Sequence, residues 1–366
     1  MQIVSGYPLS NVEGVDKITS TDKITSPYFV DSITQLNASS IVSTSVHDTN
    51  EKYYFGISKD NVTGSVQFHA TYGNVNGYGA NTDGGNIKSE TETIYKQWAN
   101  LLLKESEVTG GFFISKAGSS AAQTGQDSEI FVLVGQRSLM GDRLNKKNWT
   151  IVLSGSVSSL IANNTGSLLA LTDDSNTTAA TSTPAGPRYN IVSGSQGSVA
   201  KAASVKTYGW FYPDQGALVF SAAELSESLP GVHEGKDVAV VYESGSQNGF
   251  GTTTSVDANY RSALRFVNCL RSTGAYLRFR DESDITSVSY FCRVRAAHAN
   301  FSNNPTFVSG SLNEIRQETM RGNPTVFITG IQLYDGAGNM VATGHLSTPL
   351  KKNFSSEATI KVKLTY

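Results

Sequence analysis

The chain has 366 residues with 29 basic and 31 acidic side chains, so its formal net charge is −2. This balance supplies no strong field for nucleic acid or for an anionic membrane surface. Charged residues make up 16% of the chain, against about 25% in an average soluble protein. The remaining polar residues are mostly Ser, Thr and Asn, and 16 Tyr and 16 Phe accompany 34 Gly. This composition favours a β-rich protein whose strands face neighbouring subunits.

The start of the chain, Met1–Gly6, lacks the basic and apolar regions of a secretory signal, and no stretch approaches 18 apolar residues. We therefore expect no membrane contact and a reducing compartment. Cys269 and Cys292 are the two cysteines, and each has apolar neighbours that favour a reduced core thiol. A bridge between them stays open, because sequence does not place their Cα atoms.

Residues 1–60 are expected to form an extended N-terminal arm. They contain a short repeat, Asp16–Ser20 followed by Asp22–Ser26, and then Pro27. Two copies cannot build a stacked solenoid. The repeat is either a duplicated linker or strand, or an extended arm that orders on a partner.

Residues 61–105 are expected to form the first part of an α/β platform. Ser65–Tyr72 alternates in the manner of a strand. Ser89 and Glu92 fit a capping box, which predicts a helix over Glu90–Lys104 packed on a sheet. The apolar residues expected to share its buried face are Ile94, Trp98, Leu101 and Leu102.

Residues 106–220 are expected to form a β-rich, sandwich-like domain, because short apolar runs alternate with turn signals. Its predicted strands are Gly111–Ile114, Ile130–Val134, Trp149–Leu153, Leu168–Leu171, Arg188–Val192 and Tyr208–Tyr212. Asp173–Gly186 is rich in Thr, Ser and Ala and predicts an exposed loop.

Residues 221–366 are expected to complete the platform with two helices and C-terminal strands. The helices are predicted at Ala222–Leu229 and at Ala258–Arg271, which ends near Gly274. The strands are predicted at Ala275–Arg280, Ser287–Arg295, Thr325–Tyr334, Met340–Ala342 and Thr359–Tyr366. Asp335-Gly336 between two of these runs predicts a hairpin. The predicted fold class is α+β and β-rich: a mixed α/β platform with an inserted or adjacent all-β sandwich-like domain.

The sequence lacks the phosphate-loop, nucleophile-elbow and dinucleotide motifs of common enzyme classes. His233-Glu234 begins like a zinc-protease motif, but Asp237 stands where the second histidine is needed. We predict no metal, no cofactor and no catalytic residue.

Paired carboxylates are the remaining enzymatic alternative. Asp173-Asp174 precedes a loop, and Glu282 with Asp284 is expected in a turn between two strands. A general acid and base must face one another across a cleft with one of them desolvated. Adjacent acids in turns are usually solvated caps, so we expect a protein without enzymatic activity.

Seven arginines between Arg261 and Arg295 are the one local charge feature. Two of them lie one helical turn apart and the strand arginines alternate, so the pattern favours a basic patch. Arginine is favoured at protein interfaces, whereas nucleic-acid binding calls for interleaved aromatics or a larger positive excess. We predict a protein interface rather than a nucleic-acid site. Its residues are Arg261, Arg265, Arg278, Arg280, Arg293 and Arg295.

Four C-terminal segments carry a resemblance to a known class of proteins. They are Ser302–Phe307, Asn323–Asp335, Gly344–Lys352 and Ile360–Leu364. Together they resemble a block found in virion structural proteins of large contractile-tailed bacteriophages. With weaker similarity in earlier segments, the resemblance covers residues 90 to 366. The hairpin Gly330–Asp335 is also similar to segments of other tail and baseplate proteins.

The resemblance implies a non-enzymatic structural component of the virion, a wedge-type tail or baseplate assembly protein that acts through protein–protein interfaces. Its partners would be other tail and baseplate proteins, with several copies in each particle, assembled in the host cytoplasm. The alternatives are a receptor-binding or fibre-attaching tail protein and a neck or tail-completion protein. In the receptor-binding case Asp173–Gly186 would be the recognition surface.

Overall fold

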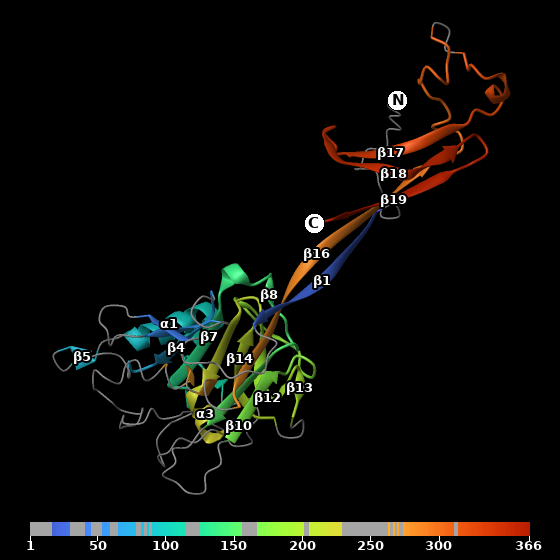
Figure 1. Cartoon of the computed structure of the whole chain (residues 1–366). Helices are drawn as coiled ribbons and strands as arrows, with labels where there is room; N and C mark the ends of the chain where they lie inside the picture. Colours follow the sequence, from blue (N-terminus) through green and yellow to red (C-terminus); the bar gives the residue numbers. More distant parts are fainter. Residues whose placement is uncertain are drawn as a thin grey trace. The chain divides into compact units, whose positions relative to one another are not determined.

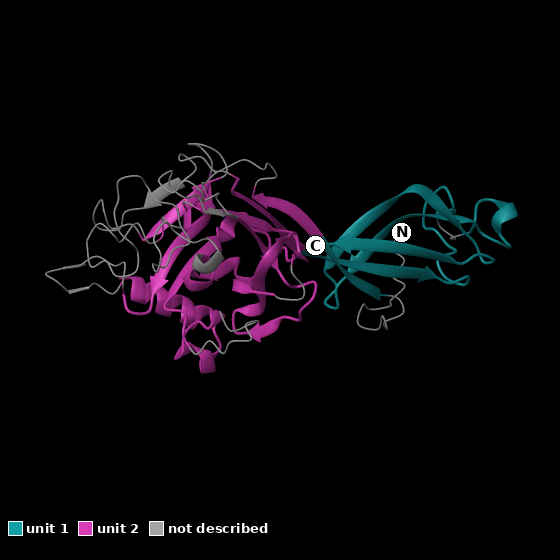
Figure 2. Cartoon of the chain, turned by 90° about the horizontal axis from the view of Figure 1, so that it is seen from below, with its two compact units in different colours: residues 1–23, 284–366 teal, residues 24–283 magenta. Residues whose placement is uncertain are grey.

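The structure is a computed structural model. It describes residues 17–29, 41–44, 53–58, 65–77, 82–83, 86–87, 90–114, 125–155, 167–200, 205–228, 263, 266–267, 269–270, 274–310 and 314–366. The chain divides into two compact units (Figure 2). Unit 1 comprises residues 1–23 and 284–366, and unit 2 comprises residues 24–283.

Strands dominate both units, which confirms the predicted β-rich α+β class. Unit 2 contains β2 (Ile41–Thr44), β3 (Tyr54–Ser58), β4 (Val66–Asn74), β5 (Thr82–Asp83), β6 (Asn86–Ile87), β7 (Glu129–Gly135), β8 (Arg143–Leu144), β9 (Thr150–Gly155), β10 (Ser167–Asp173), β11 (Thr181–Thr183), β12 (Gly186–Ser195), β13 (Ser198–Val199), β14 (Thr207–Tyr212) and β15 (Ala217–Ser221). Its helices are α1 (Glu90–Leu102), α2 (Glu105–Val108) and α3 (Ala222–Ser228). Unit 1 contains β17 (Val326–Tyr334), β18 (Met340–Lys352) and β19 (Ala358–Thr365). The dividing points of the units fall within β1 (Lys17–Phe29) and β16 (Tyr276–Val294).

Most strands of unit 2, together with β1 and β16, form one large antiparallel sheet that curls into a half-barrel (Figure 1), whereas β5 and β6 pair with each other in a separate two-stranded sheet. The strand order of the large sheet is β1-β16-β9-β10-β12-β14-β15-β7-β4-β3-β2. The strands β8 and β19 also pair with β16, and β11 and β13 pair with β12. The sheet therefore joins strands that are distant in sequence, such as β4 with β7 and β15 with β7.

The centre of this sheet is buried on both faces. Every residue of β14 and β15 is buried, and successive side chains alternate between two cores. Phe211 and Phe220 belong to the first core, whereas Trp210 and Val219 belong to the second. Because side chains of a strand alternate between faces, a fully apolar strand requires a cover on each side.

The first core is aromatic. Trp149 stacks on Phe279 with ring centroids 5.3 Å apart and planes 3° apart, and it also meets Phe211 at 5.2 Å. Phe266 lies in the described part of the predicted helix 258–271 and packs on Phe131 and Phe220. The helical residues described there are 263, 266–267 and 269–270, and all of them are buried. The rest of that predicted helix lies outside the described residues.

The second core lies under α1. Tyr95 is buried, donates its hydroxyl proton to Asp127 O at 2.8 Å and accepts the Phe112 N–H at 3.0 Å. Gly73 of β4 makes room for the helix, because a Cβ there would lie 3.0 Å from Tyr95 Cα. The sheet thus continues beneath α1 without a side chain at this point.

Three predictions are corrected in detail. The helix α1 is confirmed, but its buried face is Thr91, Tyr95, Ala99 and Leu102; Leu101 is exposed, and the predicted cap Ser89 lies outside the described residues. Gly111–Ile114 is not a strand, because Gly111 has φ +74° and the Ile114 N–H bonds Asp127 rather than a neighbouring strand. The two strands predicted before and after Glu282 are one continuous strand, β16.

Unit 1 has a thinner core. The strands β17 and β18 form a two-stranded sheet, and β19 pairs along β16 from Ser287↔Thr365 to Val294↔Ala358. The hairpin predicted at Asp335-Gly336 is confirmed by the turn that joins β17 to β18. The buried apolar residues among the described part of this unit are Val288, Val308, Val326, Leu333 and Ala358.

Candidate interaction surfaces

Large apolar side chains are exposed on unit 1. Phe327 of β17 is 60% exposed and Val341 of β18 is 61% exposed. We define the apolar hairpin surface as the exposed apolar side chains of β17 and β18, namely Phe327, Tyr334, Met340, Val341 and Leu350. The register places Phe327 and Leu350 on opposite faces of the hairpin, so both faces carry exposed apolar side chains that are available to a partner.

The strand pattern explains why these side chains face outwards. Val326 and Leu333 of β17 are buried, whereas their neighbours Phe327 and Tyr334 are exposed. A two-stranded sheet has two faces, and this one buries only part of one of them. Nearby, Phe301 and Phe354 line an open hollow. Unit 1 therefore offers more apolar surface than its own chain covers.

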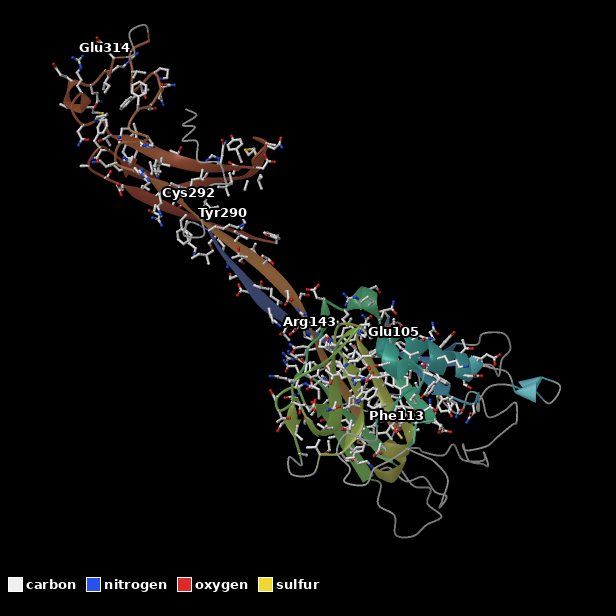
Figure 3. The ribbon with its side chains drawn as sticks, turned by 180° about the vertical axis from the view of Figure 1, so that it is seen from behind. Glu105, Phe113, Arg143, Tyr290, Cys292 and Glu314 are labelled. Atoms are coloured by element: carbon white, nitrogen blue, oxygen red, sulfur yellow. The ribbon has the colours of Figure 1, made fainter. Side chains whose placement is uncertain are left out.

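A cationic face lies on the paired strands β16 and β19. In the antiparallel register Phe291 is opposite Lys361, and Arg293 is opposite Thr359, so these side chains share one face. The Lys361 Nζ lies 5.7 Å from the centroid of the Phe291 ring. Arg293, Lys361 and Lys363 are all exposed. The other face carries Tyr290 and Cys292, both half-buried (Figure 3).

Lys352 is the buried cation of unit 1. Its side chain has no exposed area, and Nζ donates to Ala296 O at 2.9 Å, Asn300 Oδ1 at 2.9 Å and Asn353 O at 2.8 Å. Burial lowers the pKa of the Lys352 ammonium, and the charge of Glu357 opposes that shift. The three oxygens use all three ammonium protons, so Lys352 ties the end of β18 to the segment after β16.

The six arginines predicted as one interface are divided by the structure. Arg278 and Arg280 belong to unit 2 and are half-buried. Arg293 and Arg295 belong to unit 1 and are exposed. Arg261 and Arg265 lie outside the described residues. The interface role of this group stays a prediction.

Of the four carboxylates expected as solvated caps, Asp173, Asp174 and Glu282 are buried, whereas Asp284 is exposed. Asp173 accepts the Lys147 N–H at 3.0 Å and the Ser175 hydroxyl at 3.1 Å. Asp174 accepts the backbone and side-chain N–H groups of Asn190 at 3.0 and 2.8 Å. Burial raises the pKa of Asp173, while these hydrogen bonds oppose the shift. Both groups hold turns of their own chain in place.

Glu282 and its neighbour Asp281 are also buried, and they lie in strand β16 rather than in a turn. The Arg143 Nε lies 2.6 Å from Glu282 Oε1. Asp281 accepts the Gly141 N–H at 2.8 Å. These polar partners, together with the pairing of β8, explain why the acids continue a strand.

Arg188 forms a second ionic contact in unit 2, between two half-buried side chains. Its guanidinium lies 4.0 Å from the centroid of the Trp210 ring, and Nη1 is 3.1 Å from Glu107 Oε2. Burial alone would raise the pKa of Glu107, but the hydrogen bonds and charge of Arg188 outweigh it and lower the pKa. This contact ties α2 to β12.

The edge strand β1 is the most exposed element of regular structure. It pairs with β16 at one end of the sheet order, and Lys17 to Pro27 are all exposed. The repeat noted in the sequence lies within it, so Ile18 and Ile24 occupy equivalent positions six residues apart. Both are about half exposed, at 53% and 50%.

The predicted loop Asp173–Gly186 is only partly exposed. Residues 176–180 are exposed, whereas Thr183 and Ala185 are buried and β11 occupies part of the range. The exposed turn is the part of this loop that is free to meet a partner.

No group of three or more His, Cys, Asp or Glu side chains able to hold a metal ion occurs within the described residues. His233 lies outside them. Cys269 is buried, Cys292 is half-buried, and the two are not joined by a disulfide bond. Across the same part of the chain, no helix is long and apolar enough to cross a membrane.

The site search in the sequence missed Lys352, Lys361 and Lys363. The last two could have been found, because Ile360–Leu364 alternates apolar with Lys and predicts one cationic face. Lys352 gives no such signal, since its burial depends on oxygens supplied from around residue 300.

Comparisons of the chain with protein-family models, with curated proteins and with solved structures found no match. Function is therefore argued from the surfaces described above.

Proposed function

We propose that this protein is a non-enzymatic structural component of a bacteriophage virion, a tail or baseplate subunit of the wedge type that acts through protein–protein interfaces. The observation that carries the proposal is the apolar hairpin surface. It lies on β17 and β18, and its residues Phe327, Tyr334 and Leu350 fall within the segments Asn323–Asp335 and Gly344–Lys352 that resemble virion structural proteins. The partners are other tail and baseplate subunits.

The chemistry of the surface supports assembly over solvent exposure. Burying apolar area contributes roughly 25 cal/mol per Å², so a subunit that covers Phe327, Val341 and Met340 gains free energy that the isolated chain lacks. The cationic face of Arg293, Lys361 and Lys363 adds a charged surface in the same unit. Charges of this kind set orientation and association rate more than affinity.

The buried carboxylates support a structural role for unit 2. Asp173, Asp174, Asp281 and Glu282 all accept hydrogen bonds or ion pairs from their own chain. Each of them stabilises a turn or a strand junction of its own chain, as expected of residues with a structural role.

The test is complementation of a phage whose copy of this gene is disrupted. Particles made without the protein are expected to have defective tails or baseplates, and the parent gene supplied in trans restores them. The variant Phe327→Asp/Val341→Asp should fold and express but fail to enter particles. Leu168→Asp, which changes an exposed leucine of unit 2, is the matched control and should complement. Intact infectious particles without the protein would refute the proposal.

A receptor-binding role is the second candidate, and the exposed turn at residues 176–180 is the observation that favours it. The purified protein would then bind host cells or surface glycans, and Asn176→Ala/Thr178→Ala would weaken that binding. Tail assembly would be unaffected by the same variant. Normal cell binding by this variant would eliminate the turn as the recognition surface.

A further inference from the structure

The outer edge of β1 is open. Within the described residues β1 pairs with β16 and ends the sheet order, and eleven consecutive residues from Lys17 to Pro27 are exposed. An edge strand presents unpaired N–H and C=O groups that can accept another strand. Besides β1, β16 pairs with β9, β8 and β19, so β1 is the terminal strand of this sheet and a further strand would extend it.

The repeat in β1 makes that edge complementary to itself. Residues Lys17–Asp22 read Lys-Ile-Thr-Ser-Thr-Asp, and the pattern restarts at Lys23. An antiparallel pair of identical strands has a twofold axis, and residues directly opposite each other must have the same parity. If the axis passes through Thr21, Ile18 lies opposite Ile24 of the second copy, and Ile24 lies opposite Ile18.

Charge disfavours three of the alternative registers. An axis at Ser20 places Lys17 opposite Lys23, an axis at Asp22 places Asp22 opposite itself, and an axis at Lys23 places Lys23 opposite itself. Like charges directly opposite each other destabilise a strand pair. With the axis at Thr21, Asp22 faces Ser20 and Lys23 faces Thr19, so no like charges meet.

We propose that two copies of this chain associate through antiparallel pairing of their β1 edges about a twofold axis at Thr21. The edge lysines and Pro27 discourage indiscriminate strand addition, and the match of Ile18 with Ile24 favours the register with its axis at Thr21. The strand that pairs with this edge is β1 of a second copy, because the six-residue repeat supplies Ile18 and Ile24 on both strands. This inference goes beyond the proposed function and concerns the purified chain alone.

Cysteine cross-linking tests the register in a Cys292→Ser background, because Cys269 is buried. In Thr21→Cys the Cβ atoms of the two introduced cysteines lie about 5 Å apart, so a covalent dimer should form under mild oxidation. In Thr25→Cys the two thiols are eight residues out of register, about 26 Å apart, and no dimer should form. A mixture of Lys17→Cys and Thr25→Cys chains should give the cross-linked heterodimer, since these positions are opposite.

Sedimentation of the full chain tests the association itself. The parent should show a concentration-dependent dimer, and Ile18→Asp/Ile24→Asp should weaken it more than tenfold by placing carboxylates opposite each other. Phe327→Asp is the control and should leave the dimer intact. A monomeric parent at all concentrations, or equal cross-linking of Thr21→Cys and Thr25→Cys, would overturn the inference. Neither result bears on particle assembly, which the complementation test measures separately.

Discussion

Unit 2 encloses its large side chains, whereas unit 1 leaves many of its own at the surface. The largest fully buried side chains, eleven in number, all belong to unit 2. Unit 1 buries no aromatic residue among those described, yet it exposes nine large apolar side chains against five in the larger unit 2. Unit 2 thus stabilises itself through its own core, and the described part of unit 1 leaves apolar area exposed.

The largest expected effect tests the core of unit 2. Trp149→Ala removes the ring stacked on Phe279 and leaves a cavity, so it should lower the free energy of unfolding by about 3–5 kcal/mol. Denaturant titration measures the loss. Trp149→Phe keeps most of the volume and should lose much less. A loss below about 1 kcal/mol for the alanine variant would contradict a tightly packed core.

The next effect tests what holds unit 1 together in place of aromatics. Lys352→Met leaves three carbonyl oxygens without their donor, which should destabilise the unit by about 1–3 kcal/mol. Hydrogen exchange of the amides in β18 would report the loss. Lys351→Met changes the exposed neighbour and should have no measurable effect. Equal behaviour of the two variants would show that Lys352 is not an anchor.

A smaller effect concerns the ionic contact between α2 and β12 in unit 2. The folded-state pKa of Glu107 is lowered by Arg188. The resulting stability is present above the unfolded pKa of about 4.3 and is lost as the pH falls through the lower folded pKa.

Glu107→Gln should therefore cost about 1 kcal/mol near pH 7, and its difference from the parent should shrink below pH 4. Denaturant titrations near pH 7 and below pH 4 measure this difference in the free energy of unfolding. Glu105→Gln, at an exposed site on the same helix, is the control. A difference that grows on acidification would reverse the assigned sign.

The smallest expected effect tests most directly whether the exposed apolar side chains of unit 1 contribute to its own core. Phe327→Ser should change the stability of the isolated chain by less than about 0.5 kcal/mol, because the ring is exposed. Val326→Ser changes the adjacent buried residue, 7% exposed, and should cost about 1–3 kcal/mol. Thermal unfolding of the two variants compares them. A large loss for Phe327→Ser would mean that the hairpin surface belongs to the core of its own chain.

The strands of the central sheet were predictable because they are short and apolar and are separated by turn residues. Ile130–Val134 and Tyr208–Tyr212 are such runs, and each lies in a strand. The turn at Asp335-Gly336 was predictable as well, because its stabilising features are local. The Asp335 carboxylate accepts the Ala337 N–H within the turn, and Gly338 adopts a positive φ. The buried face of α1 was misjudged by one position, because Gly73 lets the helix approach with Tyr95 rather than Trp98 innermost.

The interaction surfaces were less predictable. The arginines were expected as one patch, yet Arg278 and Arg293 fall in different units although they share one strand. Local alternation places residues on faces but does not say where a compact unit ends. Asp173 and Glu282 resemble solvated turn acids in sequence, and their burial depends on Lys147 and Arg143, which are far away along the chain.

Sequence by itself determined the β-rich class, the main strands, the hairpin at Asp335 and the repeat that makes β1 complementary to itself. These features depend on residues close together in the chain, whose spacing and turn chemistry act locally. Tertiary structure alone decided which apolar side chains are enclosed, which carboxylates are buried and that Lys352 is an anchor. These outcomes depend on contacts between segments far apart in sequence, and no local pattern specifies which segments will meet.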